Sequence, residues 1–186
     1  MFDYQVFTEN LNLLPLTPEW LEAMRSGPAK FQSFTGYRLP DPYTEFPEAL
    51  DHIILHLKTH PSQPPWMSFA IIHTETSTYI GQAGYKGQPN QDGIVEIGYE
   101  IARAFRSRGY AHEVIRHLIR EAFNRKEVKA ILAHTLPQKN PSNHLLIKNK
   151  FVFQSLIVDP DDGPVWQWIL KRTAYTFSYM QDPLIN

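Results

Sequence analysis

Apolar residues recur at helical spacing in the segment that begins at Tyr110. They fall at positions i, i+3, i+4, i+7, i+8 and i+11: Ala111, Val114, Ile115, Leu118, Ile119 and Ala122. Polar residues lie between them: Arg116, His117, Arg120 and Glu121. This pattern predicts an amphipathic helix that packs its apolar face on the core and turns its polar face to solvent.

Shorter helices are predicted on both sides of this segment. Thr17 before Pro18 is typical of an N-cap followed by proline at the first helical position, and predicts a helix that runs to about Ser26–Gly27. Apolar residues at core spacing predict a second helix over about Pro47–His60, and a short helix is expected over Pro141–Asn149. Proline is frequent before residue 66, so we expect irregular loops there.

Strand patterns fill most of the remaining chain. Runs of apolar, aromatic and β-branched residues predict strands over Trp66–His73, Thr78–Tyr85, Ile94–Ala102, Val128–Leu136, Phe151–Val158 and Val165–Lys171. The first three are expected to be consecutive antiparallel strands. The long helix separates the third strand from the fourth, which predicts a β–α–β unit at the centre of an α+β fold. No repeat or Gly/Ser linker interrupts the chain, so we expect one domain over residues 1–186.

The composition of the chain excludes several classes of protein. The chain has 186 residues, 42% of them hydrophobic and 20% charged, which is typical of a folded domain with one sizeable core. A net charge of −1 gives no electrostatic reason to bind nucleic acid or an anionic membrane. The absence of Cys excludes disulfides, thiolate nucleophiles and Cys-ligated metals. No signal-peptide pattern and no long apolar run are present, so we expect a soluble, cytoplasmic protein.

One candidate binding site lies at the start of the long helix. The segment Arg106-Ser107-Arg108-Gly109-Tyr110-Ala111 joins the third predicted strand to this helix. The first N–H groups of a helix lack partners and coincide with the positive end of its dipole, and glycine lets a ligand approach the backbone. The segment therefore suits a diphosphate. The alternative is that Gly109 serves only a tight turn and that the arginines are solvated.

The context of this segment resembles a known family. VEIGYEIARAFRSRGYAHEVIRHLIREAF is similar to the central signature of the GNAT superfamily of acyl-CoA-dependent N-acetyltransferases, especially its RimJ/RimL-like branch, in which Arg/Gln-x-x-Gly-x-Gly/Ala follows a strand and opens a helix. LPQKNPSNHLLIKNKFVF resembles the later Pro-x-Asn-x-x-Ser…Lys-x-Gly-Phe segment of the family. The likeness spans about Leu13 to Lys171.

The resemblance implies a fold and a cofactor. The fold would be the GNAT acyl-CoA N-acyltransferase fold: a central, mostly antiparallel mixed sheet of about seven strands, splayed between the fourth and fifth and flanked by about four helices. The co-substrate would be acetyl-CoA. The residues expected to bind it are Ile101, Ala102, Arg103, Arg106, Ser107, Arg108, Gly109, Tyr110, Ala111, Asn140, Ser142 and Lys148.

Two positions depart from the family pattern. Lys139 stands where the family has Asn, with Asn140 one place later, which puts a side-chain contact to the pantetheine arm in doubt. Lys150 stands where the family has Gly before Phe151, and we expect a locally altered turn there. A tyrosine acid used by some relatives would fall near Leu146, where this chain has none.

The family reaction assigns three catalytic roles. Transfer of acetyl from a thioester to an amine needs a base, stabilisation of an oxyanion and a proton for the thiolate. By analogy, Glu96 is the first candidate for the base and Glu100, on the same strand face, is the second; each could instead be solvated or pair with an arginine. Ser142 is the candidate proton donor, although it could simply cap a helix. A backbone N–H near Ile101 would bind the oxyanion.

Metal and nucleotide motifs are weak or absent. His112 and His117 are spaced one residue too far apart for a zincin pair on one helix face. His52, His56 and His60 share a helical row, but no carboxylate completes a coordination shell by spacing, so we expect a solvated face and no metal site. The sequence contains no P-loop and no Gly-x-Ser-x-Gly elbow. Trp166 and Trp168 are expected on one strand face, as core or substrate-wall residues.

Three functions are therefore compared. The first is an enzyme, an acyltransferase that moves acetyl from CoA to a primary amine (a protein N-terminus, an amino acid or a small amine) by direct attack in a ternary complex. The second is a non-catalytic acyl-CoA sensor or interaction module of GNAT fold. The third is an interaction domain that binds no CoA. Residues 19–66 and 159–164 would shape the acceptor pocket, and monomer and homodimer both remain open.

Overall fold

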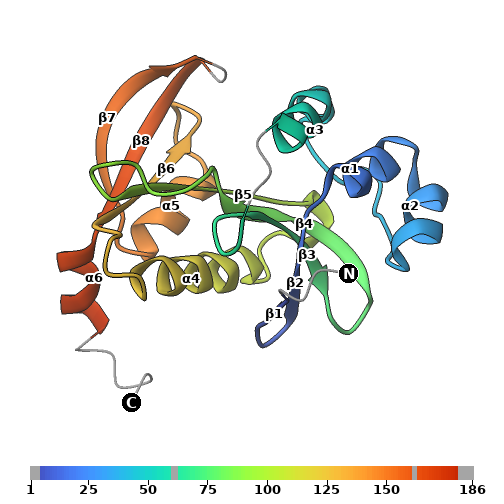
Figure 1. Cartoon of the computed structure of the whole chain (residues 1–186), viewed down its shortest axis with the longest axis horizontal. Helices are drawn as coiled ribbons and strands as arrows, with labels where there is room; N and C mark the ends of the chain where they lie inside the picture. Colours follow the sequence, from blue (N-terminus) through green and yellow to red (C-terminus); the bar gives the residue numbers. More distant parts are fainter. Residues whose placement is uncertain (1–4, 60–62, 161–162, 180–186) are drawn as a thin grey trace. The chain divides into compact units, whose positions relative to one another are not determined.

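The structure is a computed structural model that describes residues 5–59, 63–160 and 163–179. The chain divides into two compact units. The first contains residues 1–86 and 99–114, and the second contains residues 87–98 and 115–186. Strand β5 (Ile94–Ile101) and helix α4 (Tyr110–Phe123) pass from one unit into the other. Figure 1 shows the elements in chain order.

Eight strands form one mixed sheet in the order β1-β2-β3-β4-β5-β6-β8-β7. The first unit supplies four of them: β1 (Val6–Phe7), β2 (Leu11–Pro15), β3 (Ser68–His73) and β4 (Thr78–Tyr85). Neighbours among these four run antiparallel, which confirms the predicted hairpin between β3 and β4. The short strands β1 and β2 were not predicted.

Helices of the first unit pack on one face of its strands. They are α1 (Pro18–Arg25), α2 (Pro28–Thr35), the 3-10 turn η1 (Pro47–Ala49) and α3 (Leu50–Thr59). Thr17 caps α1 as predicted, because its side chain accepts from the N–H of Trp20. The core between them is formed by Leu14, Leu16, Leu21, Ala23, Met24, Phe31, Leu39, Leu50, Ile54, Ala70, Ile72 and Tyr79.

The second unit contains the remaining strands: β6 (Ala130–Thr135), β7 (Val152–Asp159) and β8 (Gly163–Lys171). β6 runs parallel to β5 and antiparallel to β8, and β7 pairs with β8 along its length (Figure 1). The β5–β6 ladder runs from the Ile94–Ala130 pair to the Ile97–Ala133 pair, and both strands continue past it. This end of pairing matches the predicted splay, and the sheet has one strand more than predicted.

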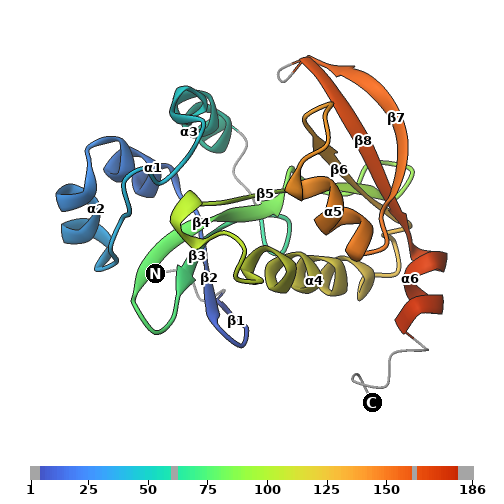
Figure 2. The ribbon, with the colours of Figure 1, turned by 180° about the vertical axis from the view of Figure 1, so that it is seen from behind.

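Besides α4, the described part of the second unit contains two helices, one between β6 and β7 and one after β8. They are α5 (Pro141–Lys148) and α6 (Arg172–Tyr179), which continues directly from β8 (Figure 2). The Arg172 guanidinium donates to the carbonyls of Phe123, Arg125 and Val128. These carbonyls follow the C-terminal end of α4, where a cation is favoured by the helix dipole. Arg172 therefore ties α6 to the turn between α4 and β6.

The apolar face of α4 is confirmed, but its predicted polar face is partly wrong. Val114, Ile115 and Leu118 are buried. His117, expected in solvent, is only 8% exposed, and its Nδ1 lies 3.2 Å from Nη2 of Arg120. Burial disfavours the charged imidazole and lowers the pKa of His117. The ring therefore packs as a neutral, largely apolar group that accepts one hydrogen bond.

The two predicted tryptophans share a face of β8. The ring of Phe153 lies 5.7 Å from the rings of both Trp166 and Trp168. Nε1–H of Trp168 donates to the hydroxyl of Thr135 at 3.0 Å. The cluster is thus a structural contact between β6, β7 and β8.

Candidate functional site

The candidate diphosphate loop begins in the short 3-10 turn η2 (Arg103–Phe105) and ends at α4. Ser107 has φ +60° and Gly109 has φ +89°, so both residues adopt left-handed conformations. Such conformations are easy for glycine and cost energy for other residues. These two left-handed residues, separated by Arg108, change the direction of the backbone, and the chain then enters the first turn of α4.

Several N–H groups of this loop lack an acceptor. Within the described part of the chain, no hydrogen-bond acceptor is found for the backbone N–H of Ser107, Arg108, Gly109, Tyr110 or Ala111. A Cβ placed on Gly109 would meet no atom within 4 Å. The loop therefore presents unpaired donors beside open space, which is the arrangement that an anion such as a diphosphate requires.

The loop arginines differ from the expectation that all are solvated. Arg106 donates from Nε to the carbonyl of Ile101 at 2.7 Å and forms an ion pair with Glu45 at 2.9 Å. The hydrogen bond from Arg106 lowers the pKa of Glu45. Arg108 donates to the carbonyl of Ala104 and lies over the ring of Phe105. Arg103 is exposed and forms no hydrogen bond or ion pair among the described residues, but its charge also contributes to the lowered pKa of Glu45.

The first turn of α4 is held by side chains of the same unit. The hydroxyl of Tyr110 lies 2.8 Å from Nε2 of His73, whose Nδ1 lies 2.9 Å from the hydroxyl of Thr76. The carboxylate of Glu113 accepts from the hydroxyl of Thr8 and from the backbone and side-chain N–H groups of Asn10. These contacts fix the end of the helix that carries the unpaired N–H groups.

Glu100 anchors a loop. Its carboxylate accepts from the hydroxyl of Thr44 at 2.9 and 3.0 Å and from the backbone N–H of Glu45 at 2.8 Å. A carboxylate that accepts several donors is held in place by them. The sequence had offered Glu100 as the second candidate for the base, and its contacts point instead to a structural role.

Glu96 lies in the second unit and has a different partner. Its Oε1 is 3.0 Å from Nδ1 of His134, and Nε2 of His134 is 3.2 Å from Nε2 of Gln167. The side chains of Glu96 and His134 are 24% and 10% exposed. Sequence reasoning identified Glu96 but missed His134 and Gln167, although the alternation of β6 and β8 places both on one sheet face.

Helix α5 and its N-cap carry three predicted residues. Asn140, and not Ser142, is the N-cap: its Oδ1 accepts from the N–H of Asn143 at 3.1 Å. The interpretation of Ser142 as the capping residue is therefore wrong. Ser142 is half-buried in the first turn, while Lys148 is exposed in the last turn. Lys139, which replaces the family's Asn, is exposed.

The turn after α5 keeps its conformation despite the loss of glycine. Lys150 has φ +68°. The N–H of Phe151 donates to the carbonyl of Leu146, and the N–H of Lys150 donates to that of Ile147. This pair of bonds is a Schellman motif, with Phe151 and Leu146 both buried. The hydrogen bonds of the motif hold Lys150 in the left-handed conformation, which glycine would adopt without strain.

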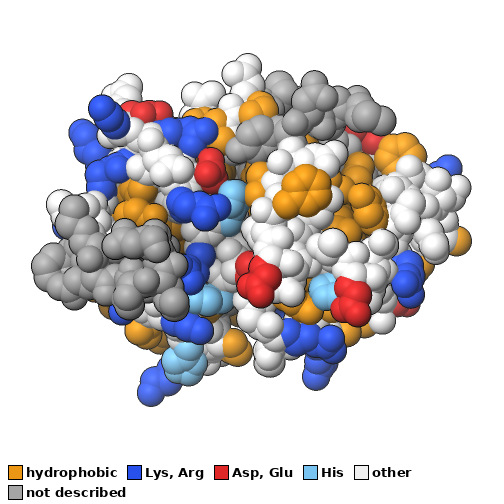
Figure 3. Space-filling model, turned by 90° about the horizontal axis from the view of Figure 1, so that it is seen from below, with side chains coloured by type: hydrophobic (Ala, Val, Ile, Leu, Met, Phe, Trp, Pro, Cys, Tyr) orange, Lys and Arg blue, Asp and Glu red, His pale blue; other side chains and the backbone are white. Residues whose placement is uncertain are grey.

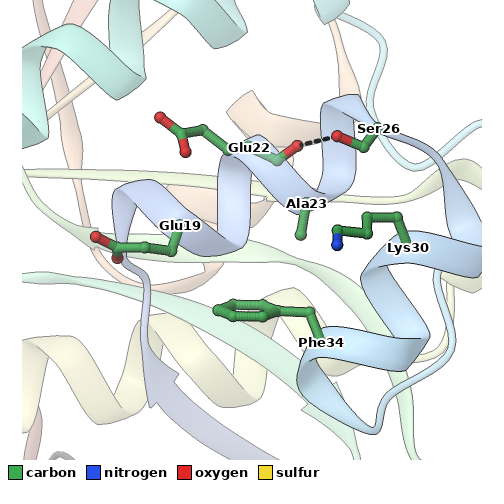
Figure 4. A pocket seen from close by; sticks show the side chains of 6 residues that line it. All are labelled: Glu19, Glu22, Ala23, Ser26, Lys30 and Phe34. Carbon is green, nitrogen blue, oxygen red and sulfur yellow. Dashed lines mark hydrogen bonds between the residues drawn. The ribbon is translucent and has the colours of Figure 1, made fainter.

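A shallow pocket of about 330 Å³ lies between α1 and α2. Figure 4 shows Glu19, Glu22, Lys30 and Phe34 around it. Glu22 also forms an ion pair with Lys58 at 2.6 Å. Both signs of charge line this pocket, so its electrostatics favour neither a cationic nor an anionic ligand.

Surface and metal-binding features add no competing site. Figure 3 shows Lys and Arg side chains interspersed with carboxylates and apolar groups on the face seen from below. In the portion of the chain that is described, no group of three or more His, Asp or Glu could hold a metal ion. His52 and His56 are exposed, and His60 lies outside the described residues. No described helix is long and apolar enough to cross a membrane.

The sequence and the fold both match known acetyltransferases. A family model described as an acetyltransferase (GNAT) domain matches residues 10–152. The N-acetyltransferase p20 of Bacillus licheniformis is 30% identical over 125 residues, which cover 67% of this chain and 70% of that protein. The N-acetyltransferase YjdG of Bacillus subtilis is 27% identical over 111 residues, which cover 60% and 66% of the two chains.

Solved structures share the fold at low sequence identity. RimL, a ribosomal L7/L12 α-N-protein acetyltransferase in complex with CoA, has a TM-score of 0.63 at 15% identity, covering 92% of this chain and 99% of that one. Spermidine N-acetyltransferase from Vibrio cholerae, with CoA and spermine, has a TM-score of 0.64 at 16% identity, covering 91% and 99%. A structure from the predicted RimJ/RimL-like branch thus shares this fold. With the family model matching most of its length, the chain belongs to the GNAT family of acetyltransferases.

Proposed function

We propose that this chain is an acetyl-CoA-dependent N-acetyltransferase that acts on a primary amine by direct attack in a ternary complex. The observation that carries the proposal is the row of unpaired N–H groups from Ser107 to Ala111 at the start of α4, beside open space at Gly109. These donors suit the diphosphate of CoA, and the exposed Arg103 suits its 3′-phosphate. We assign the whole of residues 1–186 to one catalytic domain.

The remaining predicted residues are assigned to the cofactor and the reaction. Ile101, Ala102 and the segment from Arg106 to Ala111 would bind CoA, together with Asn140, Ser142 and Lys148. In the reaction the neutral amine attacks the thioester carbonyl, the C–S bond breaks and the thiolate leaves. Glu96 would remove the amine proton, Ser142 would protonate the thiolate, and a backbone N–H near Ile101 would stabilise the oxyanion. The N–H of Ala102 is already bound to the carbonyl of Ile80, which leaves other N–H groups for this role.

Glu96 is preferred to Glu100 because its environment suits a base. Glu96 is half-buried and faces an imidazole, whereas Glu100 is bound by the hydroxyl of Thr44 and the N–H of Glu45. A base must be able to accept the proton of the incoming amine. The acceptor class is a protein N-terminus, an amino acid or a small amine; RimL acts on a protein and the V. cholerae enzyme is a spermidine acetyltransferase. We further propose that the protein acts in the cytoplasm as a monomer or homodimer.

An acceptor screen tests this function. The purified chain is incubated with acetyl-CoA and a panel of peptides with free N-termini, amino acids and polyamines, and acetylated products are detected by mass spectrometry. Transfer to one class, with release of an equal amount of CoA, supports the proposal. Binding of acetyl-CoA without transfer to any class favours the sensor alternative, and absence of binding favours the interaction domain.

A further inference from the structure

Three polar side chains form a continuous row on one face of the second unit. His134 of β6 and Gln167 of β8 are direct partners in the antiparallel ladder. Glu96 of β5 pairs in register with Leu132, two residues before His134 on the same face. The register therefore brings Glu96, His134 and Gln167 together from three neighbouring strands.

The hydrogen bonds in this row define the protonation of the histidine. Nε2 of Gln167 is an amide nitrogen, which can only donate, and it lies 3.2 Å from Nε2 of His134. Nε2 of His134 must then be the acceptor, so that a neutral ring carries its proton on Nδ1. Nδ1 lies 3.0 Å from Oε1 of Glu96, which accepts. The donors consequently point in one direction along the row, from Gln167 through His134 to Glu96.

We propose that His134 is a positioning residue for Glu96, held by Gln167 in the neutral Nδ1–H tautomer so that its Nδ1–H orients the carboxylate that receives the amine proton. This inference rests on the proposed function, in which Glu96 is the base. His134 is only 10% exposed, so the ring is confined by its neighbours. A buried donor at a fixed position limits the rotamers of the carboxylate.

Within the described strands of the second unit, the register places charged residues on this face at the ends of β7 and β8. By register, Lys171 lies at the end of β8 and Asp159 at the end of β7 that pairs with Gly163. On β5 itself, Glu100 lies four residues after Glu96 and therefore on the same face of the strand. Its carboxylate is bound to Thr44 and Glu45. Nδ1 of His134 lies within hydrogen-bonding distance of Glu96.

The tautomer is tested without any enzyme assay. The nitrogens of histidine are labelled with ¹⁵N, and the signals of His134 are assigned by their loss in His134→Asn. The proposal predicts a protonated Nδ1 and an unprotonated Nε2 at pH 7.5. A proton on Nε2, either alone or together with one on Nδ1, would overturn it. Gln167→Leu removes the donor that fixes the tautomer, and should shift the population away from Nδ1–H.

The positioning role is tested by two variants of different chemistry. Asn places its side-chain amide near the position of Nδ1 and can still donate to Glu96, whereas Leu cannot donate. His134→Leu should lower kcat about tenfold or more and move the acid limb of the pH–rate profile to higher pH, because a carboxylate without its donor holds a proton more tightly. His134→Asn should recover most of the turnover and the wild-type acid limb.

Equal losses in His134→Leu and His134→Asn, or an unchanged acid limb in His134→Leu, would overturn the positioning role. Ser155→Ala is the matched control, since Ser155 lies opposite Gln167 in the β7–β8 ladder and, among the described residues, forms no hydrogen bond with Glu96 or His134. A wild-type protein that transfers no acetyl group refutes the proposed function and this role with it. A wild-type protein that is active, with the wrong tautomer, refutes this inference alone.

Discussion

Glu96 and Glu100 lie four residues apart on β5, with the same orientation parity, yet their surroundings differ. Glu100, in the first unit, accepts from a hydroxyl and a backbone N–H of the 44–45 segment. Glu96, in the second unit, faces a histidine that is in turn fixed by a glutamine. One carboxylate holds a loop, and the other, the proposed base, contacts an imidazole. Position on the strand does not distinguish them; their hydrogen-bond donors do.

The same contrast holds for the two units as a whole. In the first unit the carboxylates of Glu45, Glu100 and Glu113 all hold loops or helix ends, and the candidate ligand contacts are backbone N–H groups and the side chain of Arg103. In the second unit the candidate chemistry is carried by side chains. We therefore expect substitutions in the first unit to affect binding or stability, and substitution of Glu96 to affect turnover.

The largest effect is expected from Gly109→Val. Valine disfavours the φ of +89° and would fill the space beside the unpaired N–H groups. The affinity for acetyl-CoA should fall more than a hundredfold, as measured by titration calorimetry. Gly87→Val is the control, because Gly87 also has a positive φ, of +118°, and open space around it, but lies outside the loop. Equal affinity in the two variants would refute the placement of the cofactor loop.

The next largest effect distinguishes the roles of Glu96 and Glu100. Glu96→Gln removes the base and should lower kcat about a hundredfold at pH 7. The loss should be smaller at pH 9, where more of the amine is neutral without help. Glu100→Gln should leave kcat within about threefold and lower the free energy of unfolding by about 1 kcal/mol, since one oxygen can still accept. If Glu100→Gln has the larger, pH-dependent loss of kcat, the two roles are reversed.

A smaller effect concerns the stability of the second unit. The pKa of His117 is lowered by burial, so the unfolded chain binds a proton more readily than the folded chain below about pH 6.5. The stabilising contribution is present above pH 6.5 and is lost as the pH falls toward the lowered pKa. From pH 7 to 5, wild type should lose up to about 1.4 kcal/mol per pH unit relative to His117→Leu. Denaturant unfolding of the two proteins at each pH measures this difference.

The smallest effect is expected from Lys150→Gly. Glycine relieves the left-handed backbone at φ +68° but gains freedom in the unfolded chain, so the net stabilisation should be about 0.5 kcal/mol. Thermal unfolding should show a midpoint about 1–2 °C higher. Lys148→Gly, inside the last turn of α5, should instead destabilise by up to about 1 kcal/mol. A lower midpoint in Lys150→Gly would mean that the lysine side chain contributes contacts of its own.

Most long elements could be predicted because their patterns are local. β4 has the predicted bounds, and α4 begins at Tyr110 as predicted. α2 was missed although Pro28 starts it and Gly36, with φ +81°, follows its end. α6 is rich in Thr and Tyr, which are weak helix formers, and the contacts of Arg172 stabilise its start. Such tertiary contacts leave no signal in the local sequence.

In the candidate site, too, features set by the local sequence could be predicted, and features set by contacts between distant residues could not. The loop around Gly109 could be identified because a glycine between a strand and a helix start is a local pattern. The burial of His117 and the pairing of His134 with Glu96 depend on contacts between distant residues, and no spacing rule reports them. The role of Asn140 as the cap of α5 was also missed, although Asn before Pro141 is a recognisable N-cap pattern.

The most direct test of the central claim is a calorimetric titration of the full chain with acetyl-CoA, with dephospho-CoA titrated in parallel. The loop of unpaired N–H groups predicts micromolar binding of acetyl-CoA, and the exposed Arg103 predicts weaker binding of dephospho-CoA. Arg103→Ala should abolish that difference while preserving the binding of dephospho-CoA. Absence of binding at millimolar acetyl-CoA would contradict the claim that this loop is a cofactor site.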